Sequence, residues 1–599
     1  MSDASFASER GSKPLVDDRE PHVSSRDSAA APWNAGIAAH WRWVEDRLAR
    51  LSDWFNPILV KETRQALRSW QFTLTFILLL VACWVVTIGG VALIGPSIYY
   101  AAGGGELLRA YYAILSLPLL VVVPFAAFRS LAAEREDNTY DLLSITTLRP
   151  RQIIGGKLAS SIVQMTVFFS AITPCLAFTY LLRGVDAPTI ALLLAYTFLA
   201  SLGLSMLGLL LATLARQRYG QLVLSVGFVA LLLYGFAKAQ EFAGWLVQFG
   251  YELYAVGNFW IMNLFGATFY ATTLALAYLA AAAMITFAAE NRSTPLRIAM
   301  LVQQATLIGW VAYAWIAFEY NATGVLILGI PSGCYWFAMG SMLNGEQAQM
   351  SRRVMRRLPQ TVLGRVFLTW LNPGPSSGFM FAVANLTAIA VLCFAAEAIG
   401  DWSGSGNPGG SGFVYFVVIG WSYVVAYLGL GCLVVALLRK ITEVTMFASV
   451  LLHLLLLLAG SGIPCSIQWM SLDLQNKPYS YLQVTNPVWT LEYILEFSPV
   501  PEEPVLAVIV PAAAICLLLL NLPGMVREIE RVRTALPARV TEDEAELHPP
   551  PESLPRSPWD EPAEGDNAGR ELQMDERSLV SQRYSNNSNW LGLGGCGKL

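Results

Sequence analysis

Residues that could do chemistry are few in this chain and far apart. The eight cysteines form no C-x-x-C pair, and six of them fall inside apolar runs. A zinc site or a disulfide framework is therefore not expected. The four histidines are too scattered to make a metal cluster: His22, His40, His453 and His548.

Motifs for nucleotide binding are incomplete. The nearest approach to a phosphate-binding loop is the stretch 153–158, Ile-Ile-Gly-Gly-Lys-Leu. It lacks the earlier glycine and the Ser or Thr after the lysine that a Walker A loop needs. No H-E-x-x-H zinc motif and no kinase motif set is present. We therefore expect no enzyme activity, no catalytic residue and no bound cofactor in this chain.

The composition is that of a membrane protein. Of the 599 residues, 55% are hydrophobic and only 14% are charged, whereas a typical soluble domain carries roughly a quarter charged residues. The mean hydropathy is +0.49. These values exclude a disordered chain, a nucleic-acid-binding protein with a basic surface and a cytosolic enzyme. The net charge of −4 suggests no charged partner.

Long apolar runs predict an all-α, polytopic transmembrane bundle. A membrane-spanning helix needs about 20 apolar residues, and about twelve runs qualify by that length. Pro331 and Gly333 predict a kink or a break in the eighth of them. The runs are Phe72–Ile94, Leu108–Phe128, Leu158–Leu182, Thr189–Leu214, Leu222–Ala239, Thr268–Ala288, Ile298–Phe318, Gly324–Met342, Phe379–Ile399, Phe413–Leu438, Phe447–Ile463 and Val505–Leu522.

Positive charge predicts the topology. Lys and Arg concentrate in cytoplasmic loops. With the N-terminus inside and twelve alternating spans, all of the 39 Lys and Arg residues fall inside except Arg109, Arg183, Lys238 and Lys477. Both termini are therefore expected in the cytoplasm. The polar segments 1–53 and 524–599 are expected to be disordered cytoplasmic tails.

An amphipathic helix is expected at residues 54–71, just before the first span. Asn56 is a suitable N-cap and Pro57 suits the first helical position. Leu59, Thr63, Ala66, Leu67 and Trp70 fall on one side of this helix, and Lys61, Arg64, Gln65 and Arg68 on the other. This pattern favours a helix lying in the membrane interface. The alternative is an ordinary cytoplasmic lead-in whose charge only fixes topology.

The loop 129–157 between the second and third spans is long and patterned. Charges of both signs stand at its start, and Leu142, Leu143 and Ile145 form an apolar strip in its middle. Pro150 can restart a helix that leads into the third span. The loop suits a surface docked on another protein, with apolar anchors and a charged rim. From composition alone, a solvated loop is an equal alternative.

Three motifs resemble the ABC-2 type family of ABC transporter permeases. They are Asn-Pro-Ile-Leu-Val-Lys-Glu-x-Arg-Gln at 56–65, Glu-Arg-Glu-x-x-Thr-x-Asp-Leu-Leu at 134–143, and Leu-Arg-Pro-x-Gln-Ile-Ile-x-Gly-Lys at 148–157. The resemblance implies an interface helix, a six-span unit over 72–290 and a coupling segment, 129–157, that docks on a nucleotide-binding subunit.

The resemblance also implies which residues take part. Docking is expected from Glu134, Arg135, Glu136, Asp137, Thr139, Leu142 and Leu143, and the interface helix uses Asn56, Pro57, Lys61, Glu62, Arg64 and Arg68. It further implies a separate ABC ATP-binding subunit that holds ATP and Mg²⁺, a homodimer or heterodimer of permease chains, and export across a bacterial cytoplasmic membrane.

Polar stripes mark two spans of the six-span unit. Ser160, Gln164 and Ser170 mark the third, and Thr197, Ser201 and Ser205 mark the fourth. Such stripes commonly let helices pack closely, and the alternative is a substrate path. The aromatic connection Gln240–Ala267 is expected either to form short re-entrant helices or to be a plain external loop.

Two other classes of function remain open from the sequence. One is a membrane-embedded assembly or anchoring protein that uses the permease fold without transport. The other is an ion-coupled secondary transporter, which only His453 supports, since charged residues are scarce at span centres. A histidine there is more often hydrogen-bonded across helices. The additional six-span region 291–523 carries no assigned role.

Overall fold

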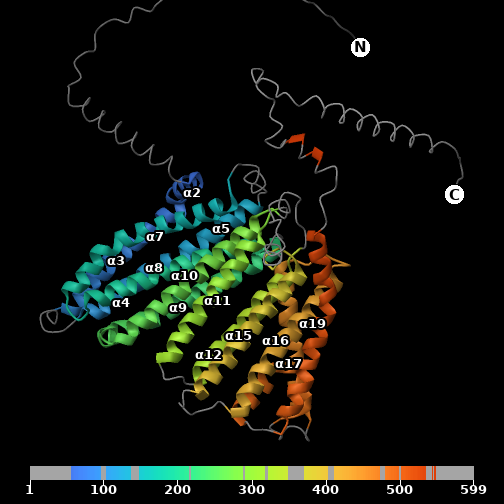
Figure 1. Cartoon of the computed structure of the whole chain (residues 1–599). Helices are drawn as coiled ribbons and strands as arrows, with labels where there is room; N and C mark the ends of the chain where they lie inside the picture. The colour runs from blue at the N-terminus through green and yellow to red at the C-terminus, as the bar shows by residue number, and fades with distance from the viewer. Residues whose placement is uncertain are drawn as a thin grey trace, which may run out of the picture. The chain divides into compact units, whose positions relative to one another are not determined.

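Helices account for all the regular structure in the described parts of the chain (Figure 1). The computed structural model describes residues 56–95, 103–136, 148–214, 218–287, 290–317, 322–347, 370–402, 410–471, 479–497 and 501–533, with two short pieces at 542–543 and 546–547. No strand occurs within these ranges. The expected all-α class is confirmed.

Eleven helices in these ranges are long and apolar enough to cross a membrane. They lie in α3 (Trp70–Ile94), the continuous helix of α4 (Gly104–Leu117), η2 (Pro118–Val122) and α5 (Val123–Glu136), α7 (Pro150–Leu181), α8 (Ala187–Leu214), α9 (Arg218–Ala255), α10 (Gly257–Ile285), α11 (Ser293–Ala317), α15 (Pro375–Trp402), α16 (Gly410–Leu438), α17 (Met446–Met470) and α19 (Glu503–Arg533). Shorter helices are α2 (Pro57–Leu67), η3 (Tyr481–Thr485) and α18 (Pro487–Phe497).

The eighth expected run forms α12 (Ala322–Asn344), which is not one of those eleven. The Ser293 hydroxyl, at the start of α11, donates to Glu346 Oε1 just after α12, at 2.7 Å. Helix α12, with 23 residues, therefore runs back alongside α11, with 25 residues. With α12, the described residues contain twelve long helices. The expected break is wrong, because α12 continues through Pro331.

The expected external connection at Gln240–Ala267 is also wrong as a loop. Helix α9 runs for 38 residues to Ala255, and α10 begins at Gly257. At 1.5 Å per residue α9 is about 57 Å long, well beyond a bilayer core of about 30 Å. Aromatic residues without proline allow the helix to continue, so these residues extend both helices past the apolar spans.

The last helix is longer than its apolar run. Val505–Leu522 was expected to end the membrane region, but α19 extends to Arg533 and contains both Pro511 and Pro523. The C-terminal tail was expected to begin at residue 524, and this boundary is too early because α19 continues to Arg533.

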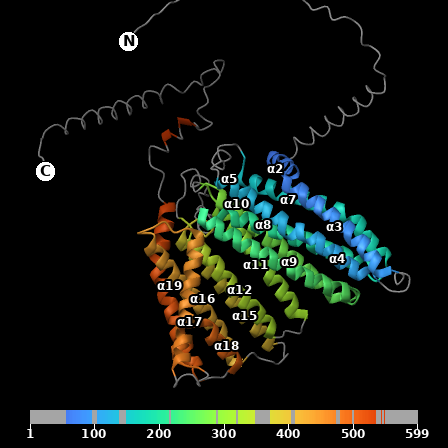
Figure 2. The ribbon, with the colours of Figure 1, turned by 180° about the vertical axis from the view of Figure 1, so that it is seen from behind.

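Buried apolar residues form three clusters. One lies among α3, α4, α7, α8 and α9, around Leu115 and Phe168. A second, around Phe128 and Ile154, joins α2 to α5, α7, α8, α9 and α10. The third spans the second half of the chain, from α10 to α19, around Trp336 (Figure 2). Many large apolar side chains of α3, α9 and α17 are exposed instead, as expected for helices that face lipid.

Candidate functional site

A buried group of three charges unites the three motif segments. Lys157 Nζ on α7 lies 2.9 Å from Glu62 Oε1 on α2 and 3.1 Å from Glu134 Oε1 on α5. Its side chain is 1% exposed. Lys157 also donates to the Ser130 carbonyl, at 3.3 Å. We call Glu62, Glu134 and Lys157 the Lys157 cluster.

Neighbouring residues in the sequence hold the Lys157 cluster in place. The Asn56 side chain accepts from the Ile58 N–H at 3.1 Å and starts α2, and its amide donates to the Gln152 carbonyl on α7. Gly156 lets the two helices meet, because a Cβ there would lie 2.9 Å from Ile58 Cβ. Helix α2 therefore packs against the start of α7, next to Lys157 (Figure 1).

The basic side of the interface helix is exposed as expected, but residues assigned to neither side are buried. Asn56 and Pro57 start the helix as expected. The buried side, however, carries Ile58 and Glu62, and Glu62 turns inward to Lys157. The exposed basic residues are Lys61, Arg64 and Arg68. A helix that only lies on lipid would not bury a carboxylate, so α2 is held by the protein as well.

Both described ends of the coupling segment are fixed to the bundle. At one end Arg135 donates to the Thr213 carbonyl on α8 at 2.8 Å, and Arg129 pairs with Glu136 at 3.8 Å. At the other end α7 starts at Pro150, as expected. The remaining docking candidates lie outside the described residues: Asp137, Thr139, Leu142 and Leu143.

The polar stripe of the fourth span lies between helices. Thr197 donates to Tyr112 Oη on α4 at 3.1 Å. Ser201 donates to the Leu119 carbonyl in the π-helical turn η2. Ser205 is fully buried too. Close packing of α8 on the second span accounts for Thr197 and Ser201, whereas the Ser205 hydroxyl has no hydrogen-bond partner among the described residues.

The stripe of the third span is divided. Ser160 and Gln164 are buried, and the Gln164 amide donates to the Ser160 carbonyl at 3.4 Å. Ser170 is exposed and donates to the Val167 carbonyl within its own helix. The six candidate path residues therefore do not share one open surface.

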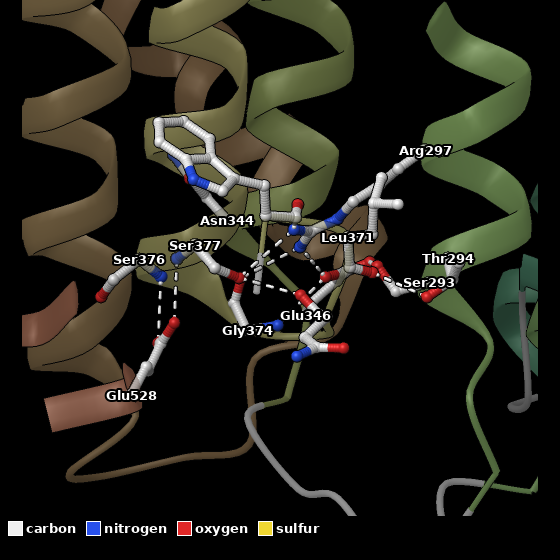
Figure 3. Close-up of polar contacts among 12 residues, drawn as sticks. Ser293, Thr294, Arg297, Asn344, Glu346, Leu371, Gly374, Ser376, Ser377 and Glu528 are labelled. Atoms are coloured by element: carbon white, nitrogen blue, oxygen red, sulfur yellow. Dashed lines mark hydrogen bonds and ion pairs between the residues drawn. The ribbon is translucent and has the colours of Figure 1, made fainter. Parts of the chain in front are cut away.

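Sequence reasoning missed a second buried ion pair, in the second half of the chain (Figure 3). Arg297 Nη2 on α11 lies 2.6 Å from Glu346 Oε2, and Arg297 is 0% exposed. Arg297 Nη1 donates to the Trp370 carbonyl at 2.7 Å, while Glu346 Oε2 accepts from the Gly374 N–H at 3.2 Å. We call Arg297, Glu346, Trp370 and Gly374 the Arg297 cluster.

Next to the Arg297 cluster, the start of α15 is capped by another helix. Glu528 on α19 accepts from the backbone N–H groups of Ser376 and Ser377, at 3.1 and 2.8 Å (Figure 3). These are orphan donors of a helix N-terminus, which a carboxylate satisfies well. The contacts fix α15 to α19.

The stretch 374–378 also has the G-x-S-x-G spacing of a hydrolase nucleophile elbow, which sequence reasoning passed over. In the described residues from 370 onward, the stretch follows a turn rather than a strand and begins helix α15. The serine at the third position of the motif is Ser376, and its backbone N–H donates to Glu528 Oε1 at 3.1 Å. The hydroxyl of the next residue, Ser377, donates to the Asn372 and Gly374 carbonyls, both at 3.0 Å. These bonds are those of a helix start.

His453 on α17 is fully buried and bonded to two neighbours. The Asn344 amide on α12 lies 3.0 Å from Nε2, and Nδ1 lies 2.7 Å from the Ser449 carbonyl. An amide N–H donates, so Nε2 accepts and Nδ1–H donates to the carbonyl. Both ring nitrogens are used in a bond across helices and a bond within α17, the structural role that the sequence favoured.

Asp186, just before α8, joins the start of α8 to the end of α9. It accepts from the Thr189 N–H at 3.3 Å and from the Tyr254 hydroxyl. Burial raises the pKa of Asp186, but the hydrogen bonds from Tyr254 and Thr189 outweigh it and hold the pKa below its usual value. The carboxylate form is therefore the one that stabilises the folded state.

The Asp186 contribution to stability is expected to depend on pH. With a lowered folded pKa, it is present above the usual aspartate pKa of about 3.9 and is lost as the pH falls through the folded value. In thermal unfolding of the detergent-solubilised protein, Asp186→Asn should lower the midpoint at pH 7, and the gap to wild type should narrow below about pH 4. The matched control is Glu106→Gln, at an exposed carboxylate. A gap independent of pH would contradict the ionic role.

The fold defines a class: an all-α, multi-pass membrane protein, with buried charge pairs holding the ends of its helices together. Comparison with family models, curated proteins and solved structures finds no match to this chain. Any narrower assignment rests on the residues themselves.

Proposed function

We propose that this chain is the membrane-spanning permease subunit of an ABC exporter, driven by a separate ATP-binding subunit that docks on the coupling segment. The observation that carries the proposal is the Lys157 cluster. It brings together the interface helix α2, the end of the second span and the start of the third, which are the three places where the sequence resembles ABC-2 permeases.

The geometry supports a mechanical role for the coupling segment. Glu134 and Lys157 lie on the two sides of residues 137–147 and contact each other at 3.1 Å. A force on that stretch would reach α5 and α7 through a short ionic contact, and α2 through Glu62 at 2.9 Å. Such an arrangement suits transmission of a domain movement to the spans better than a loosely tethered loop would.

The rest of the proposal follows from the resemblance. ATP and Mg²⁺ would bind the partner subunit, since this chain lacks a Walker A loop. Two permease units, either copies of this chain or related chains, would enclose the path in a bacterial cytoplasmic membrane. An apolar interior favours a hydrophobic or amphipathic substrate.

Replacing residues 137–143 by a Gly-Ser segment of equal length should abolish the complex with the ATP-binding subunit. The replacement leaves the Lys157 cluster intact, so the thermal unfolding midpoint of the chain should stay within a few degrees of wild type. Co-purification of an ATP-binding subunit co-expressed with this chain, and the ATPase rate of that subunit in vesicles, are the measurements.

A matched control for this replacement is the double change Lys238→Ser and Glu241→Ser, which removes an exposed pair on α9. It should leave binding and ATPase stimulation unchanged. If the Gly-Ser variant still bound and stimulated the subunit, the docking role would be wrong. A complex that forms without ATPase stimulation or transport would favour an anchoring protein.

A further inference from the structure

A deep hollow lies within the second half of the bundle, away from the Lys157 and Arg297 clusters. Its volume is about 600 Å³, within the range of about 300–1,000 Å³ that small-molecule sites occupy. Its lining comes mainly from α12, α15, α16 and α18, with one residue of α17, and the exposed carboxylates of α18 lie at its edge. Figure 2 shows α18 beside the end of α16.

Glycine keeps this hollow open. Gly329, Gly333 and Gly420 line it. An added Cβ would meet nothing within 4 Å at Gly329, and only ordinary contacts, at 3.9 and 3.8 Å, at Gly333 and Gly420. By contrast, a Cβ at Gly340 on α12 would lie 2.9 Å from Leu428, so that glycine is needed for helix packing.

At these three positions a larger side chain would enter the hollow without a clash, whereas protein interiors are normally filled. Helical glycines elsewhere, such as Gly227 and Gly462, also meet nothing within 4 Å, so open space at a glycine does not by itself indicate a ligand. Here the three glycines line one hollow, and their shared position leaves room for a bound molecule.

The chemistry of the hollow changes from its walls to its edge. The walls are almost entirely apolar, with Phe337, Leu386 and Leu457 among them. On α18, Glu492 and Glu496 line the edge, four residues apart and thus on one face of the helix. Both carboxylates are exposed, and neither forms an ion pair with another described residue.

This pattern selects a ligand with an apolar tail and a positive head. Lipid tails are as apolar as these walls, so a tail that enters from the bilayer gains little by the transfer. Selectivity must then come from the head, because a carboxylate attracts a nearby cation and repels an anion. Trp421 and Tyr427 also line the hollow, and aromatic rings can add to the attraction of a cation.

We propose that this hollow binds a single-tailed cationic amphiphile from the lipid phase, with the tail along the glycine-lined wall and the head at Glu492 and Glu496. This site is independent of the proposed exporter function. It requires neither the ATP-binding subunit nor a second permease chain.

The test uses dodecyltrimethylammonium with a photoreactive diazirine in its tail, on the full chain in phosphatidylcholine nanodiscs. Labelling should concentrate on α12 and α16 near Gly333 and Gly420. Unlabelled dodecyltrimethylammonium should compete, while dodecyl sulfate and dodecylphosphocholine should compete at least tenfold less well. Even labelling of all lipid-facing helices, α3 included, would show annular contact only and would overturn the proposal.

Two sets of variants separate the walls from the head site. Gly329→Leu, which enters open space, and Gly333→Leu should each reduce specific labelling at least tenfold. Gly462→Leu is the matched control, because a Cβ there also meets nothing within 4 Å and Gly462 does not line the hollow. Unfolding midpoints confirm that each variant is folded.

Glu492→Gln with Glu496→Gln should leave tail labelling detectable but remove the preference for the cation over the sulfate. Glu241→Gln, at an exposed carboxylate on α9, should keep that preference. If the double variant still preferred the cation, or if the folded Gly329→Leu protein were labelled like wild type, the site would be wrong.

Discussion

Lys157→Met is expected to destabilise the folded chain by about 3–5 kcal/mol, the usual effect of removing one partner of a buried ion pair. The lysine is 1% exposed and is the nearest cation to both Glu62 and Glu134, at 2.9 and 3.1 Å. Methionine has a similar volume, so little packing is lost. The two carboxylates would remain close together, with Lys61 Nζ 4.0 Å from Glu62 and 3.6 Å from Glu134.

Thermal unfolding in detergent measures this effect, and α2 should show it first. Hydrogen exchange of residues 57–67 should rise in the variant, since α2 is held to α7 through this cluster. Lys61→Met is the matched control. Its side chain is 57% exposed, and an exposed pair is worth about 0–1 kcal/mol.

A neutral version of the Lys157 cluster distinguishes the effect of uncompensated charge from the effect of lost side-chain packing. Lys157→Met combined with Glu62→Gln and Glu134→Gln leaves no buried charge, and replacing a complete buried ionic group is often neutral. The triple variant should therefore recover most of the stability lost by Lys157→Met alone. If it were as unstable as the single variant, lost packing rather than uncompensated charge would be the cause.

Arg297→Met is expected to be as damaging, by about 3–5 kcal/mol. It would leave the Glu346 carboxylate, in a residue 1% exposed, with only the Ser293 hydroxyl and the Gly374 N–H as partners. The Trp370 carbonyl would lose its donor as well. The start of α11, the end of α12 and the start of α15 should therefore become less stable together.

Hydrogen exchange at residues 342–346 and 370–378, together with the unfolding midpoint, measures the Arg297 effect. Lys440→Met is the matched control, because Lys440 is an exposed cation. Arg297→Lys should recover only part of the stability, since a lysine cannot bond the Glu346 carboxylate and the Trp370 carbonyl with a planar fork. Equal midpoints for wild type and Arg297→Met would contradict a structural role for the pair.

Features encoded by neighbouring residues were predicted correctly. The apolar runs predicted the long helices, and Asn56-Pro57 and Pro150 predicted the starts of α2 and α7. Errors concerned where helices end: α9 and α19 continue past their apolar runs. Apolar length marks only the part of a helix that lies in lipid, while the helix itself continues until a residue breaks it.

The sequence by itself determined an all-α membrane protein, the order of its spans and the candidate segments at their ends, because hydropathy, helix caps and charge bias are local properties. Only the tertiary structure decided which charges meet. In the sequence, Lys157 and Arg297 look like ordinary positive residues beside the ends of spans. Their partners Glu62 and Glu346 are 95 and 49 residues away. Many acidic residues could pair with each cation in the sequence. The packing of α2 and α5 on α7 brings Glu62 and Glu134 to Lys157, and the packing of α11 on α12 brings Glu346 to Arg297.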